Sequence, residues 1–140
     1  MLYMIHKANH PALTYHGGQQ HIIHLQADLH QTIKWAAKHR RPWAFTTSNA
    51  GSYYFEDYAD LNFLDRINWQ AVHAGNWSGP GISPSIREGK QAEFLIAHAF
   101  PWVLVEEIGV PSQTLLHQVK ALLQTQDHRP LVTLRPNWYY

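Results

Sequence analysis

The sequence predicts an α+β fold. Segments rich in aromatic and β-branched residues, which are typical of strands, alternate irregularly with segments of helical periodicity. Their spacing does not repeat as β-α-β units, so a doubly wound parallel sheet is not expected. With 140 residues, of which 45% are hydrophobic and 15% charged, the chain suits one globular domain over residues 1–140 and leaves little room for a second.

The first elements expected are two strands on either side of a helix. HIIHLQA, residues 21–27, is apolar enough for a short strand. DLHQTIKWAAKHR, residues 28–40, has apolar residues at helical spacing, with Asp28 placed to cap the N-terminus and basic residues in the last turn. Pro42 ends this helix, and WAFTTS, residues 43–48, predicts the second strand.

The middle of the chain predicts a short helix, a long loop and a strand. Leu61, Leu64 and Ile67 have the spacing of a short helix. NWSGPGISPSIREGK, residues 76–90, is dominated by Gly, Ser and Pro and therefore predicts a loop. A loop of that length inside a compact domain is usually functional or mobile. It leads into QAEFLIA, residues 91–97, which we expect to form a strand.

The C-terminal third predicts three more elements. WVLVEEIGV, residues 102–110, is a short strand or helix that stops at Gly109. SQTLLHQVKALLQTQ, residues 112–126, is the clearest amphipathic helix of the chain. RPLVTLRPNWYY, residues 129–140, predicts a terminal strand followed by a tail.

Charge and cysteine content exclude several classes of protein. Eleven Lys and Arg against ten Asp and Glu give no overall basic field, so any contact with nucleic acid has to come from a local patch. The absence of cysteine excludes disulfides, thiolate metal sites and a cysteine nucleophile, and is compatible with a reducing cytoplasm. No apolar run reaches membrane-spanning length and no signal peptide opens the chain. We expect a cytoplasmic protein that does not enter a membrane.

Familiar catalytic and metal motifs are missing. Although the chain has eleven histidines, His21 and His24 would point to opposite faces of a strand, and no His-Glu-x-x-His occurs, so we expect no metal site. The glycine patterns of phosphate-binding loops and the Gly-x-Ser-x-Gly elbow of serine hydrolases are also absent.

One carboxylate stands inside an otherwise apolar strand. Glu93 alternates in phase with Leu95 and Ala97 and should share their face. One interpretation is a surface acid that faces water or pairs with Arg87 or Lys90. The other is an acid that stabilises positive charge on a sugar or orients a nucleophile. Arg87 would then bind a phosphate or a nucleic-acid backbone, the alternative being an ordinary solvated loop charge.

Four blocks, in consistent order, cover nearly the whole chain: MLYMIHKANHPALTYHGGQQHIIHLQADL, WAFTTSNAG, REGKQAEFLIAHAFPWVLVEEIGV and HRPLVTLRPNWYY. Together they resemble the DarT family, the toxins of DarT–DarG toxin–antitoxin systems. The resemblance implies an ADP-ribosyltransferase fold, a split α+β sheet that clasps NAD. It also implies a glycosyltransferase that uses NAD to ADP-ribosylate a base in single-stranded DNA, thymidine in the best-known branch and guanosine in another. The implied partner is the macrodomain antitoxin DarG, which removes the mark.

The resemblance also implies roles for individual residues. The family's catalytic glutamate lies in its Gln-Ala-Glu-Phe-Leu block, which places it at Glu93, and the arginine ahead of it falls on Arg87. The Gly/Ser/Pro-rich segment ending near Lys90 corresponds to the substrate-recognition loop. Met1 and Asn49 are expected to line the NAD pocket, with core packing and turn geometry as the respective alternatives.

Aromatic and basic residues are candidates for DNA contacts. Three neighbouring aromatic residues would stack on a base or else pack in the core: Tyr53, Tyr54 and Phe55. Three arginines are candidates for the phosphate backbone: Arg40, Arg41 and Arg87.

The chain departs from the family pattern at two places. Asn49 stands where many relatives have a histidine, and an amide forms hydrogen bonds but carries no proton at neutral pH. Relatives also have several dozen residues, including a catalytic arginine, upstream of the Met-Leu-Tyr with which this chain begins. We therefore expect the C-terminal portion of an N-terminally truncated domain with little or no transferase activity. The alternatives are an inactive remnant that binds single-stranded DNA or the antitoxin, and a transferase acting on protein or RNA.

Overall fold

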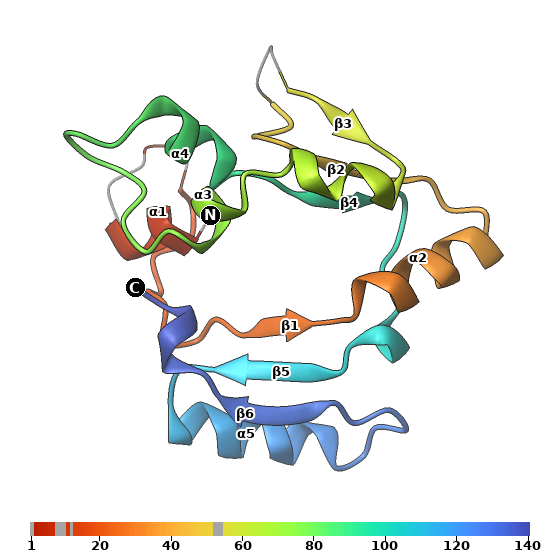
Figure 1. Cartoon of the computed structure of the whole chain (residues 1–140). Coiled ribbons are helices and arrows are strands. Elements are labelled where there is room, and N and C mark those ends of the chain that lie inside the picture. The colour runs from red at the N-terminus through yellow and green to blue at the C-terminus, as the bar shows by residue number, and fades with distance from the viewer. Residues whose placement is uncertain (1, 8–10, 12, 52–54) are drawn as a thin grey trace. The chain divides into compact units, whose positions relative to one another are not determined.

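The computed structural model describes residues 2–7, 11, 13–51 and 55–140. The chain forms two compact units, and each contains a 3-stranded sheet. Unit 1 comprises Met1–Thr32 and Phe100–Tyr140, and unit 2 comprises Ile33–Ala99. The mixture of helices and sheets confirms the predicted α+β class (Figure 1). No helix of the described ranges is long and apolar enough to cross a membrane.

The sheet of unit 1 has the strand order β1-β5-β6. Strand β1 (His24–Gln26) pairs antiparallel with β5 (Glu107–Val110), which pairs parallel with β6 (Leu131–Leu134). Helix α5 (Gln113–Leu123) connects the two parallel strands and packs against both, as Figure 1 shows. Six buried apolar side chains form the core between helix and sheet: Val105, Ile108, Val110, Leu116, Val119 and Val132. Unit 1 also contains α1 (Leu2–Lys7) and the 3-10 helices Trp102–Leu104 and Pro136–Trp138.

The opposite face of this sheet carries a buried carboxylate. Glu107 is 8% exposed, and its oxygens accept hydrogen bonds from Arg135 Nε (2.6 Å), Arg135 Nη2 (3.1 Å) and the hydroxyl of Thr133. The hydrogen bonds from Arg135 and Thr133 lower the pKa of Glu107 below its ordinary value. The guanidinium of Arg135 also lies over the ring of Trp138, 5.3 Å from its centroid. This cluster fixes the C-terminal segment on the sheet.

Gly109 lies within β5, so the prediction that it stops the element is wrong. A Cβ built at this glycine would collide with the ring of Trp138. The glycine is therefore needed for the close approach of an aromatic ring to the strand and not for a turn. The segment before it contains both predicted alternatives, because the 3-10 helix Trp102–Leu104 is followed by the strand Glu107–Val110.

Unit 2 contains the second sheet, with the strand order β3-β2-β4. Both β3 (Asp57–Tyr58) and β4 (Phe94–Ile96) pair antiparallel with the central strand β2 (Trp43–Thr46). Helix α2 (Leu29–Lys38) precedes β2, and most of it belongs to this unit. The predicted N-cap of α2 is confirmed, because Asp28 Oδ1 accepts a hydrogen bond from the Gln31 amide at 2.7 Å. Three short helices lie between β3 and β4: η1 (Leu61–Arg66), α3 (Trp69–His73) and α4 (Pro84–Gly89).

The loop predicted over residues 76–90 is wrong for residues 84–89, which form α4. The hydroxyl of Ser83 accepts a hydrogen bond from the Ile86 amide at 3.3 Å, and Pro84 occupies the first turn, where its fixed φ suits a helix. Ser83 and Pro84 therefore begin a helix here, although their residue types had indicated a loop. Gly79 and Gly81, at φ +112° and +81°, lie in the part of the segment that is irregular.

Aromatic residues gather on one face of the unit 2 sheet. Phe45 lies opposite both Tyr58 and Phe94, and Trp43 lies opposite Ile96, so all five side chains share a face. The rings of Trp43 and Phe94 stack at 5.8 Å, and those of Phe45 and Tyr58 stack at 5.6 Å. Residues that alternate with these, including the one before Phe94, point to the other face.

Candidate active site

Glu93 lies immediately before β4, and a buried threonine of β2 fixes its backbone. The amide of Thr46 donates to the carbonyl of Glu93 at 2.8 Å, and the amide of Glu93 donates to Thr46 Oγ1 at 3.0 Å. The same hydroxyl donates to the carbonyl of Ser48 at 2.6 Å, and Thr46 is 0% exposed. Both main-chain polar groups of Glu93 are thus held by a residue that has no room to move.

The carboxylate of Glu93 is exposed and, among the residues that the structure describes, makes no hydrogen bond or ion pair. The expected alternative partner Lys90 is engaged elsewhere. Its ammonium donates to the carbonyls of Val72 (2.7 Å) and Ala74 (2.9 Å), at the C-terminus of α3. Glu93 shares its face with Leu95, as predicted, and Leu95 is 41% exposed. The carboxylate is therefore available to a ligand.

Asn49 and Gln91 connect the turn after β2 to the segment that carries Glu93. Asn49 Nδ2 donates to Gln91 Oε1 at 3.0 Å, and Gln91 Nε2 donates to the carbonyl of Arg87 at 3.1 Å. Asn49 Oδ1 also accepts from the Gly51 amide at 2.7 Å, so the turn geometry considered for Asn49 is present as well. The structure thus brings the backbone of Arg87 and the side chain of Asn49 together, through a glutamine that sequence reasoning missed. Its position in the Gln-Ala-Glu block was the available signal.

Arg87 is exposed on α4, and within the part of the chain that the structure describes its guanidinium makes only a long contact, 3.5 Å from Nη2 to the carbonyl of Ile82. Most of its five donors therefore face solvent. Met1, Tyr53 and Tyr54 lie outside the described residues, and their expected contacts stay predictions. Phe55, which follows them, is 40% exposed.

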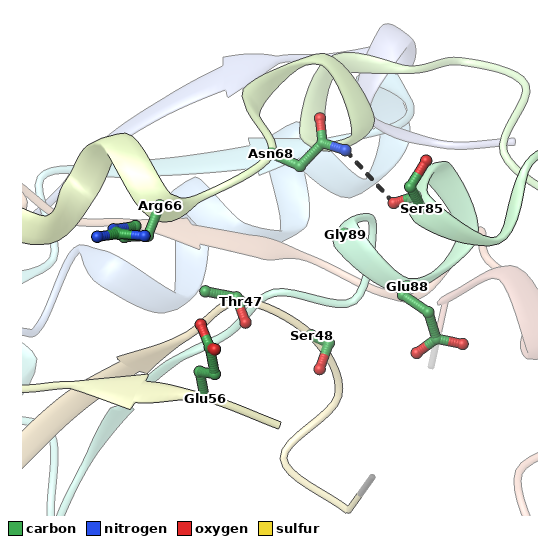
Figure 2. Close-up of a pocket in the computed structure, with 8 residues that line it drawn as sticks. All are labelled: Thr47, Ser48, Glu56, Arg66, Asn68, Ser85, Glu88 and Gly89. Atoms are coloured by element: carbon green, nitrogen blue, oxygen red, sulfur yellow. Dashed lines mark hydrogen bonds between the residues drawn. The ribbon is translucent and has the colours of Figure 1, made fainter. Parts of the chain in front are cut away.

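A pocket of about 570 Å³ lies beside this region of unit 2 (Figure 2). Its eight lining residues come from the segment after β2, the residue before β3, the end of η1, the N-cap of α3 and from α4: Thr47, Ser48, Glu56, Arg66, Asn68, Ser85, Glu88 and Gly89. Figure 2 shows a hydrogen bond between two of them, from Asn68 Nδ2 to the carbonyl of Ser85 at 3.4 Å. The lining combines two carboxylates, one guanidinium and three hydroxyls, so it suits a polar ligand. Of the described lining residues none is Glu93, Asn49 or Arg87.

A hydrogen bond links this pocket to the aromatic face. Tyr58 donates from its hydroxyl to Glu56 Oε2 at 2.9 Å, and this bond is the main reason why the pKa of Tyr58 lies above its ordinary value. The described residues contain no group of three or more His, Asp or Glu that could hold a metal ion.

Comparison with known proteins decides the family. All of residues 1–140 match the family described as "ssDNA thymidine ADP-ribosyltransferase, DarT". The chain belongs to the DarT family. The resemblance predicted from the sequence is thereby confirmed.

Curated relatives carry the name "DNA ADP-ribosyl transferase". The chain is 39% identical to the protein of Thermus aquaticus (strain ATCC BAA-2747 / Y51MC23), over all of this chain and 58% of that protein. It is 37% identical to the protein of Thermus sp. (strain 2.9), over all of this chain and 63% of that protein. A relative from Escherichia coli O127:H6 is 30% identical over 80% of this chain and 51% of its own length. The chain thus spans less than two thirds of the length of these DarT relatives.

Solved DarT structures have the same fold. Thermus sp. 2.9 DarT in complex with NAD+ matches 99% of this chain with a TM-score of 0.84 and 35% identity, and 66% of that chain is covered. Thermus sp. 2.9 DarT in complex with ADP-ribosylated ssDNA matches with the same TM-score of 0.84, and 63% of that chain is covered. The predicted ADP-ribosyltransferase fold is therefore confirmed for the chain.

Proposed function

We propose that this chain takes part in NAD-dependent ADP-ribosylation of a base in single-stranded DNA, with Glu93 as the catalytic residue and thymidine as the target base. One observation carries the proposal: the backbone of Glu93 is fixed by Thr46, whereas its carboxylate is exposed and unpaired among the described residues. Support comes from the Thermus sp. 2.9 DarT structures, which are complexes with NAD+ and with ADP-ribosylated ssDNA.

The proposed role of Glu93 follows from the charge that develops in the reaction. When the bond from the ribose C1′ to nicotinamide breaks, the electron pair leaves with nicotinamide and positive charge develops on the ribose. A carboxylate beside the ribose lowers the energy of this state and accepts a hydrogen bond from the 2′-hydroxyl. A ring nitrogen of the base then forms the new bond to C1′, and its proton passes to Glu93.

The other site residues supply positioning in this proposal. The side chain of Asn49, held by Gln91 at 3.0 Å, lines the NAD pocket together with Met1. Arg87 binds a phosphate with the donors that face solvent, and Tyr53 and Tyr54 stack on bases. As in the family at large, the reaction would make the protein a toxin and the macrodomain DarG its antitoxin.

The test is transfer of label from NAD+ to an oligonucleotide. The chain is incubated with NAD+ labelled on the adenylate phosphate and with thymidine-containing single-stranded DNA, with RNA and protein as competing acceptors and Thermus sp. DarT as the positive control. Because the chain spans 58% and 63% of the two Thermus relatives, we expect at most weak label on DNA compared with the positive control. Glu93→Gln should reduce this label by about 100-fold or more, because general acid–base groups contribute factors of that size. Glu106→Gln, at another exposed glutamate, should behave as the wild type. Transfer that survives Glu93→Gln would refute the assigned role, and label on RNA or protein alone would refute the substrate.

A second candidate is binding of single-stranded DNA or the antitoxin without chemistry. It is favoured by the share of the two Thermus relatives that the chain spans, 58% and 63%. Binding without chemistry predicts that the oligonucleotide is bound equally well by the wild type and by Glu93→Gln, with no label transferred by either.

A further inference from the structure

Positive charge is concentrated at the C-terminal end of α2, outside the candidate active site. Between Leu29 and Phe55 the sequence has no Asp or Glu, but it has four Lys and Arg residues: Lys34, Lys38, Arg40 and Arg41. The chain as a whole is nearly balanced, with 11 basic and 10 acidic residues. All four cations lie in the second half of α2 or in the turn that follows it. A local field of this kind is what a polyanion needs when the protein has no overall basic charge.

The turn that ends α2 holds an arginine in a conformation that favours glycine. The amide of Arg41 donates to the carbonyl of Ala36 (2.8 Å), and the amide of Arg40 donates to that of Ala37 (3.2 Å). This is the Schellman pattern, in which the residue at the position of Arg40 is left-handed and is usually glycine. Arg40 adopts φ +53°. A long cationic side chain thus stands where the backbone alone would select glycine.

The carbonyls of Trp35, Ala36 and Ala37, at this end of α2, already accept hydrogen bonds. The carbonyl of Trp35 accepts from both the amide (3.0 Å) and Nδ1 (2.8 Å) of His39. Lys38 and Arg40 are exposed, and no hydrogen bond or ion pair of their side chains occurs within the described ranges. Arg41 Nε is buried without a hydrogen-bond partner. This one nitrogen has lost water without gaining an acceptor among the described residues. Arg41 as a whole is only half-buried, so part of its cationic side chain stays open to an anionic ligand.

The helix dipole accounts for only part of this arrangement. Cations are favoured in the last turn of a helix, which explains Lys38 and His39. The dipole does not explain an arginine at φ +53°, one residue beyond that turn, or the unsatisfied donor of Arg41. The exposed ring of His39 stacks on Trp35 with centroids 4.4 Å apart, which holds an aromatic surface beside the cations. Cations next to a stacking surface are the combination that single-stranded nucleic acids bind.

We propose that Lys38, Arg40 and Arg41 form a phosphate-binding site for the backbone of single-stranded DNA, with the ring of His39 as a stacking surface for a base. The identity of the polymer rests on the proposed function, whereas the phosphate chemistry rests on the geometry of the turn. The site binds nucleotides that flank the modified base and takes no part in the transfer step.

Arg40→Gly tests the proposal, because it predicts opposite effects on stability and binding. Glycine suits φ +53°, so thermal stability should be equal or higher, while a phosphate contact is lost. We expect a thymidine-rich, fluorescein-labelled oligonucleotide to bind about tenfold more weakly in fluorescence anisotropy. The dependence of log K on log salt should become shallower by about 0.7, the value for one phosphate contact to a single strand. Lys120→Gln, which removes one exposed charge on α5, is the control and should change neither quantity.

One further measurement separates the possible sources of the phosphate. Binding of NAD+, measured by calorimetry without DNA, should be unchanged in Arg40→Gly. A selective loss of NAD+ affinity would assign the site to the pyrophosphate of NAD+ and overturn the proposal. Wild-type affinity and salt dependence for the oligonucleotide would also overturn it. The dependence of label transfer on Glu93 is measured in a separate experiment. The proposed phosphate site can therefore be refuted while the proposed function stands, and the proposed function can be refuted while the phosphate site stands.

Discussion

Replacing Thr46 with valine should destabilise the protein and slow the proposed reaction through the same two hydrogen bonds. The substitution keeps the volume of the side chain but removes a hydroxyl that is 0% exposed. The amide of Glu93 loses its acceptor at 3.0 Å, and the carbonyl of Ser48 loses its donor at 2.6 Å. A buried polar group left without a partner costs about 1–3 kcal/mol, so we expect a loss of about 2–4 kcal/mol in the free energy of unfolding.

The assay combines denaturant unfolding with kinetics of label transfer. Thr46→Ser is the matched control, because it retains the hydroxyl and loses one methyl group, worth about 1 kcal/mol. If the hydroxyl positions Glu93, Thr46→Val should lower kcat by up to about 100-fold, which is the effect of displacing a catalytic group by roughly 1 Å. Thr46→Ser should retain most of the wild-type kcat. KM for NAD+ should change little. Equal stability and equal kcat for the valine and serine variants would refute the reasoning.

Two more predictions concern packing and pH. Gly89→Ala should destabilise the protein by about 1–3 kcal/mol, because a Cβ there would lie 2.9 Å from the Cβ atom of Asn68 and force α4 away from α3. Gly75→Ala, with nothing within 4 Å, should leave the urea midpoint unchanged, and equal midpoints for both variants would contradict the prediction. The hydrogen bond from Arg135 lowers the pKa of Glu107, so the native state binds fewer protons than the unfolded state. The resulting stability is present above the ordinary pKa of 4.5 and is lost as the pH falls through the pKa that Glu107 has in the native state. The urea midpoint should therefore decline at acid pH, and Glu107→Gln should make this decline shallower. An equally steep decline in Glu107→Gln would contradict the prediction.

Local patterns predicted the elements that local interactions stabilise. Helix α2 begins where Asp28 caps it, and the helical spacing of residues 112–126 contains α5 (Gln113–Leu123). Strand lengths were predicted less well, because pairing with a neighbour sets them. Apolar composition suggested a strand over residues 91–97, but the ladder with β2 covers only Phe94–Ile96. The two-residue strand β3 was missed for the same reason.

In the candidate site, too, the sequence predicted what depends on local pattern and missed what depends on distant neighbours. Alternation and the family resemblance singled out Glu93, because its signal lies in its own strand. The residues that hold it were not found. Thr46 contacts Glu93 across 47 positions of sequence, and Asn49 contacts Gln91 across 42. No periodicity within one segment reports which distant strand will lie beside it, so such partners emerge only from the tertiary structure.

The proposed catalytic residue, Glu93, and the proposed DNA contact, Arg87, depend on different parts of unit 2. The backbone of Glu93 depends on the buried hydroxyl of Thr46, and the connection from α4 to β4 depends on Lys90, whose ammonium is held by the carbonyls at the end of α3. Arg87, by contrast, is exposed and projects from α4. Because Lys90 fixes the chain between Arg87 and Glu93, we expect substitutions on the exposed side of α4 to leave the carboxylate of Glu93 in place. Under the proposed roles of these two residues, DNA specificity and catalysis would therefore change separately, although only a few residues of sequence lie between them.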